Sequence, residues 1–242
     1  MEQIADHKQV LKRFPDSEFE MNLYSWLMTF FLCVVWPLGI ILKFTLSDRT
    51  DNIEDFSPLI SFYLPTIITQ LIILFLIYLV IKKEEVGFKS VGLGKFKLVY
   101  IADAILFQVT AWYILGLVSS FLVKLEFIEF YDTAPLLPQS AFEFGIFLVL
   151  CVVAAVAEET AFRGYLISRL TRISRSRVLA VFLATLAFSA GHIYQGTGGF
   201  ILIFLYGLMF AVLYFITRSL WPCVIAHFIH NAAKPVLSHF FQ

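Results

Sequence analysis

Two adjacent carboxylates and an arginine interrupt an otherwise apolar stretch in the middle of the chain. Glu158, Glu159 and Arg163 lie among small apolar residues such as Ala157 and Ala161. A charge at the centre of a membrane-spanning helix costs about 2.5–3.5 kcal/mol on insertion scales, so such groups usually pair, line a cavity or perform chemistry. Glu159 and Arg163 are four residues apart and predict an ion pair on one helical face. Glu158 points about 100° away and is left for another partner.

Two further groups of polar residues follow at positions that can meet Glu158. The basic segment 172–177 predicts a hairpin between the helix that carries Glu158 and the helix that carries His192. Counting back and forward from this turn at about 1.5 Å per residue places both side chains roughly 25 Å from it, at one depth. His227 and Asn231 are four residues apart on the last helix and reach a similar depth. We therefore expect the four groups to converge.

This combination of side chains is suited to hydrolysis by an activated water molecule. A carboxylate in an apolar cavity can take a proton from water, and Glu158 is the predicted base. His192 is expected to orient the water, while His227 and Asn231 offer hydrogen-bond donors to the oxyanion that forms on a scissile carbonyl. The sequence has no Gly-x-Ser-x-Gly motif and no cysteine near these histidines, which favours direct attack by water over a covalent intermediate.

Each polar group also has a structural interpretation. An ion pair of Glu159 with Arg163 can simply hold helices together, and His192 alone could be a hydrogen-bonded core histidine. An interhelical hydrogen bond would account for His227, and His230 is expected to pack beside the site or to support it. A zinc ion held by a glutamate and two histidines is a less favoured alternative to metal-free catalysis, because the sequence has no His-Glu-x-x-His motif. We therefore predict no cofactor.

Three short segments together resemble a known family. Residues 158–163, 188–192 and 227–231, in this order, resemble the three motifs of the CPBP family, which contains CAAX proteases and bacteriocin-processing enzymes and is also called the Abi family. The resemblance covers about residues 140–235. It implies an all-α membrane bundle with intramembrane endopeptidase activity, and it implies that Glu158 acts through water.

The resemblance also implies roles for individual residues. The implied catalytic residues are Glu158, His192, His227 and Asn231. Glu158 and His192 are implied to activate water, and His227 and Asn231 are implied to form the oxyanion site. Residues of the same motifs that are implied to support the site are Glu159, Arg163 and Phe188. The substrate is left open, since some members of the family cleave prenylated proteins and others are linked to peptide maturation or bacteriocin self-immunity.

Composition predicts a polytopic membrane protein. The chain has 242 residues, of which 60% are hydrophobic and 15% charged, and its mean hydropathy is +0.83. Because a helix needs about 20 apolar residues to cross a bilayer, the sequence predicts an all-α bundle of about seven transmembrane helices. These fall near residues 21–46, 58–81, 98–123, 141–168, 178–195, 199–217 and 219–240. We expect one membrane domain over 1–242, with a catalytic core at 141–235.

The basic residues predict the orientation and exclude one class of partner. Most Lys and Arg residues fall in the N-terminal segment, in 82–97, in 169–177 and at Arg218, which predicts a cytoplasmic N-terminus. The segment 82–97 is either a basic loop that fixes topology or a short amphipathic element on the membrane surface. Because the formal net charge is zero, we expect no nucleic-acid partner. The expected partners are membrane lipids and a substrate that is a peptide or a lipidated protein. The short, compact chain resembles the prokaryotic members of the CPBP family, which implies a bacterial plasma membrane.

Two other classes of function fit the same residues. A non-proteolytic peptide-binding or bacteriocin immunity protein would use the same fold to sequester a peptide. A proton-coupled carrier would use the buried glutamate and histidines as a relay, although the absence of an inverted repeat in the sequence counts against it.

Overall fold

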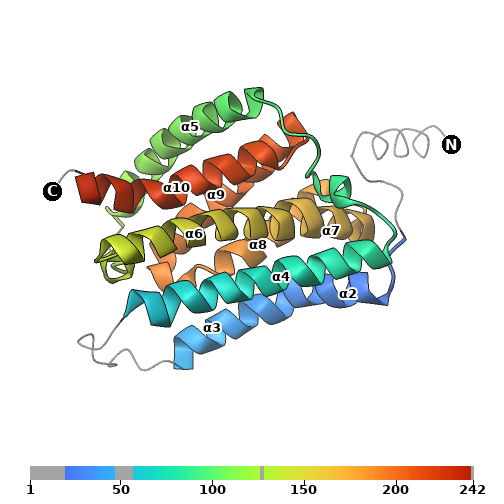
Figure 1. Ribbon diagram of the computed structural model, residues 1–242, viewed down its shortest axis with the longest axis horizontal. Coiled ribbons are helices and arrows are strands. Elements are labelled where there is room, and N and C mark those ends of the chain that lie inside the picture. Colours follow the sequence, from blue (N-terminus) through green and yellow to red (C-terminus); the bar gives the residue numbers. More distant parts are fainter. Residues whose placement is uncertain (1–19, 47–56, 126–127, 241–242) are drawn as a thin grey trace.

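The computed structural model is a bundle of helices that lie roughly along one long axis (Figure 1). The structure describes residues 20–46, 57–125 and 128–240, and within these ranges it contains helices and irregular segments but no strand. The helical elements are α2 (Leu23–Phe30), η1 (Phe31–Val35), α3 (Trp36–Leu46), η3 (Leu59–Tyr63), α4 (Leu64–Lys83), η4 (Phe88–Val91), α5 (Val99–Leu122), η5 (Ala134–Leu136), α6 (Ala141–Glu158), η6 (Glu159–Leu166), α7 (Ile167–Ser174), α8 (Arg177–Ala190), η7 (Ile193–Gln195), α9 (Gly196–Thr217) and α10 (Trp221–Phe240).

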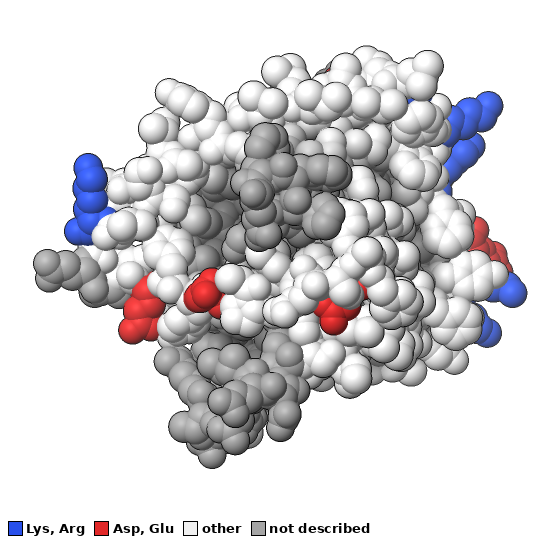
Figure 2. Space-filling view, turned by 60° about the vertical axis from the view of Figure 1, so that its left-hand side comes forward, with Lys and Arg blue, Asp and Glu red and all other residues white. Residues whose placement is uncertain are grey.

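The predicted all-α membrane bundle is confirmed. Among the described residues, five continuous helical stretches are long and apolar enough to cross a membrane, and they cover Leu23–Lys43, Leu59–Lys83, Val99–Leu122, Ala141–Ser174 and Ile193–Thr217. α8 is a shorter apolar helix, and α10 corresponds to the last of the seven predicted transmembrane helices. Figure 2 shows a surface that is mostly neither acidic nor basic, with Lys and Arg at the left and right margins of the view. The chain is therefore an integral, multi-pass membrane protein.

The two ends of the bundle are formed by different elements. At one end, on the left of Figure 1, α3 ends, α4 begins and α6 begins; we call it the α3/α4 end. At the other, α7 and α8 are joined by the predicted hairpin, in which Arg175 adopts a left-handed conformation (φ 55°) between the two helices. We call this the hairpin end.

The rod formed by α6, η6 and α7 lies in the middle of the bundle. α4 and α10 both pack against α6, and α8 packs between α7 and α9. Ala154, Ala155, Ala157 and Ala161 are buried along this rod. Small side chains let neighbouring helices approach closely, which brings polar groups on different helices within hydrogen-bonding range.

The middle of this rod is π-helical, and all eight residues of η6 are buried. Its Gly164 lies against the loop that contains η4, because a Cβ there would be only 2.4 Å from the carbonyl oxygen of Val91. The segment 82–97 is thus mainly a loop whose centre is inserted between helices, with Val91 fully buried, rather than an amphipathic helix on the surface. π-helical turns within α-helices often occur at functional sites.

A buried polar network fixes the hairpin end. Arg169 forms an ion pair with Glu84, and both side chains are fully buried. Ser25 donates to the same carboxylate over 2.7 Å, and the Tyr165 hydroxyl donates to the Ser25 carbonyl over 3.2 Å. Arg169, which the sequence placed among the basic residues of a loop, is therefore inside the protein, because α7 continues as a helix to Ser174 before the turn. The network joins α2, the end of α4, and α7.

Candidate active site

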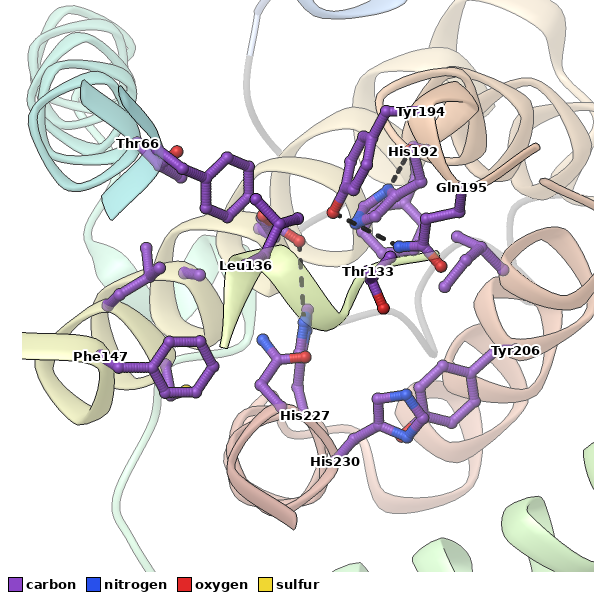
Figure 3. Close-up of a pocket in the computed structure, with 18 of the residues that line it drawn as sticks. Thr66, Thr133, Leu136, Phe147, His192, Tyr194, Gln195, Tyr206, His227 and His230 are labelled. Carbon is purple, nitrogen blue, oxygen red and sulfur yellow. Dashed lines mark hydrogen bonds and ion pairs between the residues drawn. The ribbon is translucent and has the colours of Figure 1, made fainter. Parts of the chain in front are cut away.

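A cavity of about 220 Å³ contains all four predicted catalytic residues. Glu158, His192, His227 and Asn231 line it together, although they belong to three different rods of the bundle. Figure 3 shows His192 and His227 on two sides of this space, with Tyr206 and His230 on a third. We call it the site cavity. The structure brings the predicted residues together, and their catalytic roles remain a prediction.

Glu158 is the last residue of α6 and is held by one oxygen only. Its Oε1 atom accepts a hydrogen bond of 2.8 Å from the side-chain amide of Gln70 on α4. Its Oε2 atom has no hydrogen-bond partner among the described residues and lies 3.7 Å from His227 Nε2. One oxygen is thus fixed, and the other is buried beside the cavity without a hydrogen-bond partner among the described residues. Sequence reasoning missed Gln70, although a single amide in the apolar run of α4 was a usable signal.

Glu159 is the centre of a buried cluster. Its Oε1 atom accepts hydrogen bonds from Arg163 Nη1 at 2.9 Å and from His227 Nδ1 at 2.8 Å. The expected pairing with Arg163 is present, and the bond to His227 is an additional one. A carboxylate paired with arginine can only accept, so the Nδ1 atom of His227 carries the hydrogen. Nε2 of the same ring is then directed to Glu158.

Arg163 is enclosed by aromatic rings. Its guanidinium lies over the ring of Phe188 at 4.3 Å and over that of Phe210 at 5.0 Å. Such cation–π contacts stabilise a desolvated cation by about 2 kcal/mol or more. The ring of Phe188 therefore contacts Arg163, Arg163 pairs with Glu159, and Glu159 accepts the hydrogen bond from His227. Together these contacts fix the position of the His227 ring.

The charges in this cluster nearly balance. Two carboxylates, from Glu158 and Glu159, face one guanidinium, from Arg163. With neutral histidines the sum is minus one, which is costly in a buried site. The Nε2 atom of His227 lies 3.7 Å from Oε2 of Glu158, at the edge of this cluster.

His192 follows the end of α8 and is oriented by its own helix. Its Nδ1 atom lies 3.0 Å from the carbonyl oxygen of Phe188. A carbonyl can only accept, so Nδ1 donates and Nε2 of the neutral ring is left as an acceptor. The ring also stacks on Tyr194, with centroids 6.0 Å apart. This arrangement leaves a basic nitrogen that can bind a water hydrogen.

The two remaining polar residues of α10 differ in their surroundings. Asn231 lines the site cavity and makes no hydrogen bond to another described side chain, so its amide is available to a ligand. His230 also lines the cavity, but its Nδ1 atom lies 3.2 Å from Gln108 and 3.3 Å from Trp112 on α5. It also packs on the Tyr206 ring. This agrees with the expected supporting position of His230.

The segment before α6 covers one side of the site cavity. Thr133 and Leu136, in and beside η5, line the cavity and lie across it in Figure 3. Leu136 is held by the Tyr63 hydroxyl, which donates to its carbonyl over 2.7 Å. The backbone of Tyr131 donates to the carbonyl of Gln195 over 3.1 Å. The segment is thus anchored on both sides of the cavity.

A second cavity meets the first at Glu158 and His192. Its volume is about 540 Å³, and it extends between α3 and α4 toward the α3/α4 end. Both residues line both cavities. We call it the side cavity. A ligand that occupied both cavities would pass directly by the free oxygen of Glu158.

The described residues contain no group of three His, Cys, Asp or Glu side chains arranged to hold a metal ion. The Nδ1 atoms of His192 and His227 are already engaged by a carbonyl and a carboxylate. These bonds leave the Nε2 atoms of both histidines open, so catalysis without a metal and the alternative of zinc both remain predictions.

The fold and the buried cluster define a multi-pass membrane protein with a glutamate and histidine site inside the bundle. Residues 140–233 match the family model of type II CAAX prenyl endopeptidases, described as Rce1-like. This segment, which carries every predicted site residue, is therefore similar to the Rce1-like CAAX endopeptidases, and the resemblance predicted from the three motifs is confirmed. α2 to α5 lie outside the match. No curated protein and no solved structure matches the chain.

Proposed function

We propose that the protein is an intramembrane endopeptidase in which Glu158 and His192 activate a water molecule for attack on a peptide bond. The observation that carries the proposal is the free Oε2 atom of Glu158 in a cavity shared with His192, His227 and Asn231. The bond from Gln70 fixes the other oxygen, so the carboxylate is oriented before a substrate arrives. Preorganised groups of this kind lower barriers without reorganisation during the reaction.

The first step forms the bond between water and the scissile carbonyl carbon. Glu158 accepts one proton of the water, and the acceptor nitrogen of His192 holds the other hydrogen in place. The carbonyl oxygen becomes an oxyanion, to which Asn231 donates from its amide. His227 donates from Nε2 when that atom is protonated, and its bond to Glu159 stabilises the resulting imidazolium.

The second step breaks the carbon–nitrogen bond. Glu158 returns its proton to the leaving nitrogen, which departs as an amine, and the new carboxyl group remains on the other fragment. The carboxylate is then free for another water. All bonds and protons balance with water as the only co-substrate, and general acid–base catalysis of this type contributes about 10²–10⁴-fold.

The position of the site supports a proposal for the class of substrate. Both cavities lie within helices that cross the membrane, so a substrate reaches them from the bilayer or its surface. We propose a membrane-associated peptide or a lipidated protein, with membrane lipids as the surrounding partner. We further propose a bacterial plasma membrane with the N-terminus in the cytoplasm, which the position of the basic residues supports.

The test replaces Glu158 by Gln, which keeps the size and the bond to Gln70 but removes the base. Purified protein in proteoliposomes is incubated with a farnesyl-cysteine peptide and with hydrophobic peptides that carry no lipid, and fragments are identified by mass spectrometry. We expect cleavage by the wild type and a loss of at least about 100-fold in Glu158→Gln. Glu143→Gln on the same helix, outside both cavities, is the control. Unchanged turnover in Glu158→Gln would refute the proposed base.

The same variant separates the other classes of function. A non-proteolytic immunity protein would still protect cells when it carries Glu158→Gln, whereas a protease would lose its effect. Activity that survives stringent chelation, with elemental analysis of the purified protein, distinguishes water activated by Glu158 from water bound to zinc.

A further inference from the structure

Tyr194 is a polar residue of both cavities to which the proposed reaction assigns no role. It belongs to η7, the short 3₁₀ turn between α8 and α9, and lies two residues beyond His192. Together with Glu158 and His192 it lines the site cavity and the side cavity. A tyrosine hydroxyl can both donate and accept, so its use depends on which capacity the protein already occupies.

The ring of Tyr194 is held between two other rings. It stacks on His192, with centroids 6.0 Å apart and an interplanar angle of 29°. Phe62 of η3 packs against it edge-on, also at 6.0 Å. Both are arrangements that aromatic rings prefer, so the two contacts restrict the orientation of the tyrosine. The Tyr194 ring therefore stays beside the His192 ring, as Figure 3 shows.

Within the described part of the chain, only the acceptor capacity of the hydroxyl is used. The side-chain amide of Gln195 donates to it over 3.3 Å, and this bond is drawn in Figure 3. Gln195 is itself restrained, because a Cβ on Gly199 would lie 2.4 Å from its Cβ atom and because its carbonyl accepts from the Tyr131 backbone. The hydroxyl hydrogen of Tyr194 has no acceptor among the described residues. It is therefore available to a ligand in the cavities.

Most of the groups assigned to the reaction are acceptors. The second oxygen of Glu158 can only accept when ionised, and Nε2 of neutral His192 accepts as well. Nε2 of His227 donates only when it is protonated, because Nδ1 carries the hydrogen of the neutral ring. The amide of Asn231 is the assigned donor that does not depend on protonation. The Tyr194 hydroxyl is a second donor of this kind in the same cavity.

We propose that Tyr194 is a further catalytic residue, whose hydroxyl donates to the carbonyl oxygen of the scissile bond. This inference rests on the proposed function. The attacking water already gives its two hydrogens to Glu158 and His192, and a donor to its oxygen would compete for the electron pair that attacks. Negative charge develops on the carbonyl oxygen, so a donor there binds the transition state more tightly than the substrate. Tyr194 keeps its proton throughout, and the proton balance of the reaction is unchanged.

The first experiment removes the hydroxyl by Tyr194→Phe, which keeps the ring and its contacts with His192 and Phe62. Turnover of the test peptide that the wild type cuts is measured in proteoliposomes over a range of peptide concentrations. Loss of one donor to an oxyanion lowers kcat by about 10²–10³-fold. We expect a fall of about 10²-fold in kcat with less than about a threefold change in KM, because the bond forms mainly in the transition state.

Tyr165→Phe is the matched control. Its hydroxyl is also buried and hydrogen-bonded, but to the carbonyl of Ser25 at the hairpin end, and it lines neither cavity. This variant should lose some stability, seen as a lower Tm, and should keep the kcat of the wild type. It separates the loss of a tyrosine hydroxyl as such from the loss of one at the site.

The second experiment measures binding without turnover. In two analogues of the peptide that is cut, the cleaved amide is replaced by a phosphinate, which is tetrahedral and anionic, or by a trans-alkene, which is planar and has no oxygen. Displacement of a fluorescent copy of the alkene peptide in nanodiscs gives both affinities. We expect Tyr194→Phe to lose at least about tenfold in affinity for the phosphinate, the effect of one bond to a charged group, and to bind the alkene as the wild type does.

The outcomes separate the inference from the proposed function. A wild-type kcat in Tyr194→Phe would overturn the inference and leave the proposed function standing. A lower kcat without a selective loss of phosphinate affinity would also overturn it, and would place the hydroxyl on the attacking water instead. If the wild type cuts no peptide, the proposed function fails and the inference falls with it.

Discussion

Glu158 and Glu159 are adjacent in the chain but differ in their hydrogen-bond partners, so the same Glu→Gln substitution should have different effects at the two positions. Replacing either by Gln removes a single charge and preserves volume. Glu158 accepts one hydrogen bond, from Gln70, and Oε1 of a glutamine can accept it as well. Glu159 accepts two, from the cation Arg163 and from His227, and is completely buried. The structure therefore predicts that one substitution affects activity and the other affects folding as well.

The magnitudes can be worked out from these contacts. Glu159→Gln leaves the guanidinium of Arg163 buried without its anion, and breaking a buried pair in this way costs about 3–5 kcal/mol. It also removes the group that fixes the tautomer of His227, so activity should fall in addition. Glu158→Gln removes the proposed base, which lowers turnover about 10²–10⁴-fold, but leaves no cation unpaired. Because the glutamine can still accept the hydrogen bond from Gln70, the effect of Glu158→Gln on the free energy of unfolding should stay within about 1 kcal/mol.

Tryptophan fluorescence during heating in detergent micelles, together with peptide cleavage, provides the assay. A chain of this size loses roughly 2–4 °C in Tm per kcal/mol, so Glu159→Gln should unfold at least about 6 °C below the wild type and Glu158→Gln close to it. Equal Tm values for the two variants would refute the assignment of Glu159 as the support. Cleavage at the wild-type rate by Glu158→Gln would refute the assignment of Glu158 as the base.

Three further predictions concern the surroundings of the site. Gln70→Leu frees the second oxygen of Glu158 and should lower kcat about tenfold with a small change in KM, whereas an unchanged kcat would show that the amide does not orient the carboxylate. Gly164→Ala places a methyl group against the carbonyl of η4 and should destabilise the protein by about 1–3 kcal/mol, seen as a lower Tm; a wild-type Tm would contradict this close approach. Glu84→Gln removes the carboxylate of the buried ion pair with Arg169 at the hairpin end, so the Tm should fall while the pattern of cleaved peptides stays the same, and an altered pattern would argue against a purely structural role.

The sequence was sufficient to predict the helical bundle and four of the polar residues that line the site cavity. Apolar runs of about 20 residues follow directly from the thickness of a bilayer, and five of them appear as continuous membrane-spanning helices. Counting residues from the hairpin was enough to place Glu158 and His192 at one depth, because the rise of a helix is constant. Both calculations depend only on distances along the chain.

Contacts between different helices could not be obtained in this way. The spacing of Glu159 and Arg163 indicates their pairing, but nothing in it indicates that the same carboxylate also holds His227 on α10. The partner of Glu158 was missed for the same reason, since Gln70 lies on another helix. The burial of Arg169 depends on how far α7 continues before its turn, which the basic composition of that segment conceals.

The near balance of charge around Glu159 has an electrical consequence. A single charge moved across a membrane at 100 mV gains or loses about 2.3 kcal/mol. The proposed reaction returns every side chain to its starting charge and moves protons only over the distance between neighbouring side chains, so it carries no net charge across the membrane. Turnover in vesicles should therefore be the same with and without a membrane potential, unlike that of a carrier driven by the proton gradient. The protein would then work equally well in an energised and in a depolarised cell.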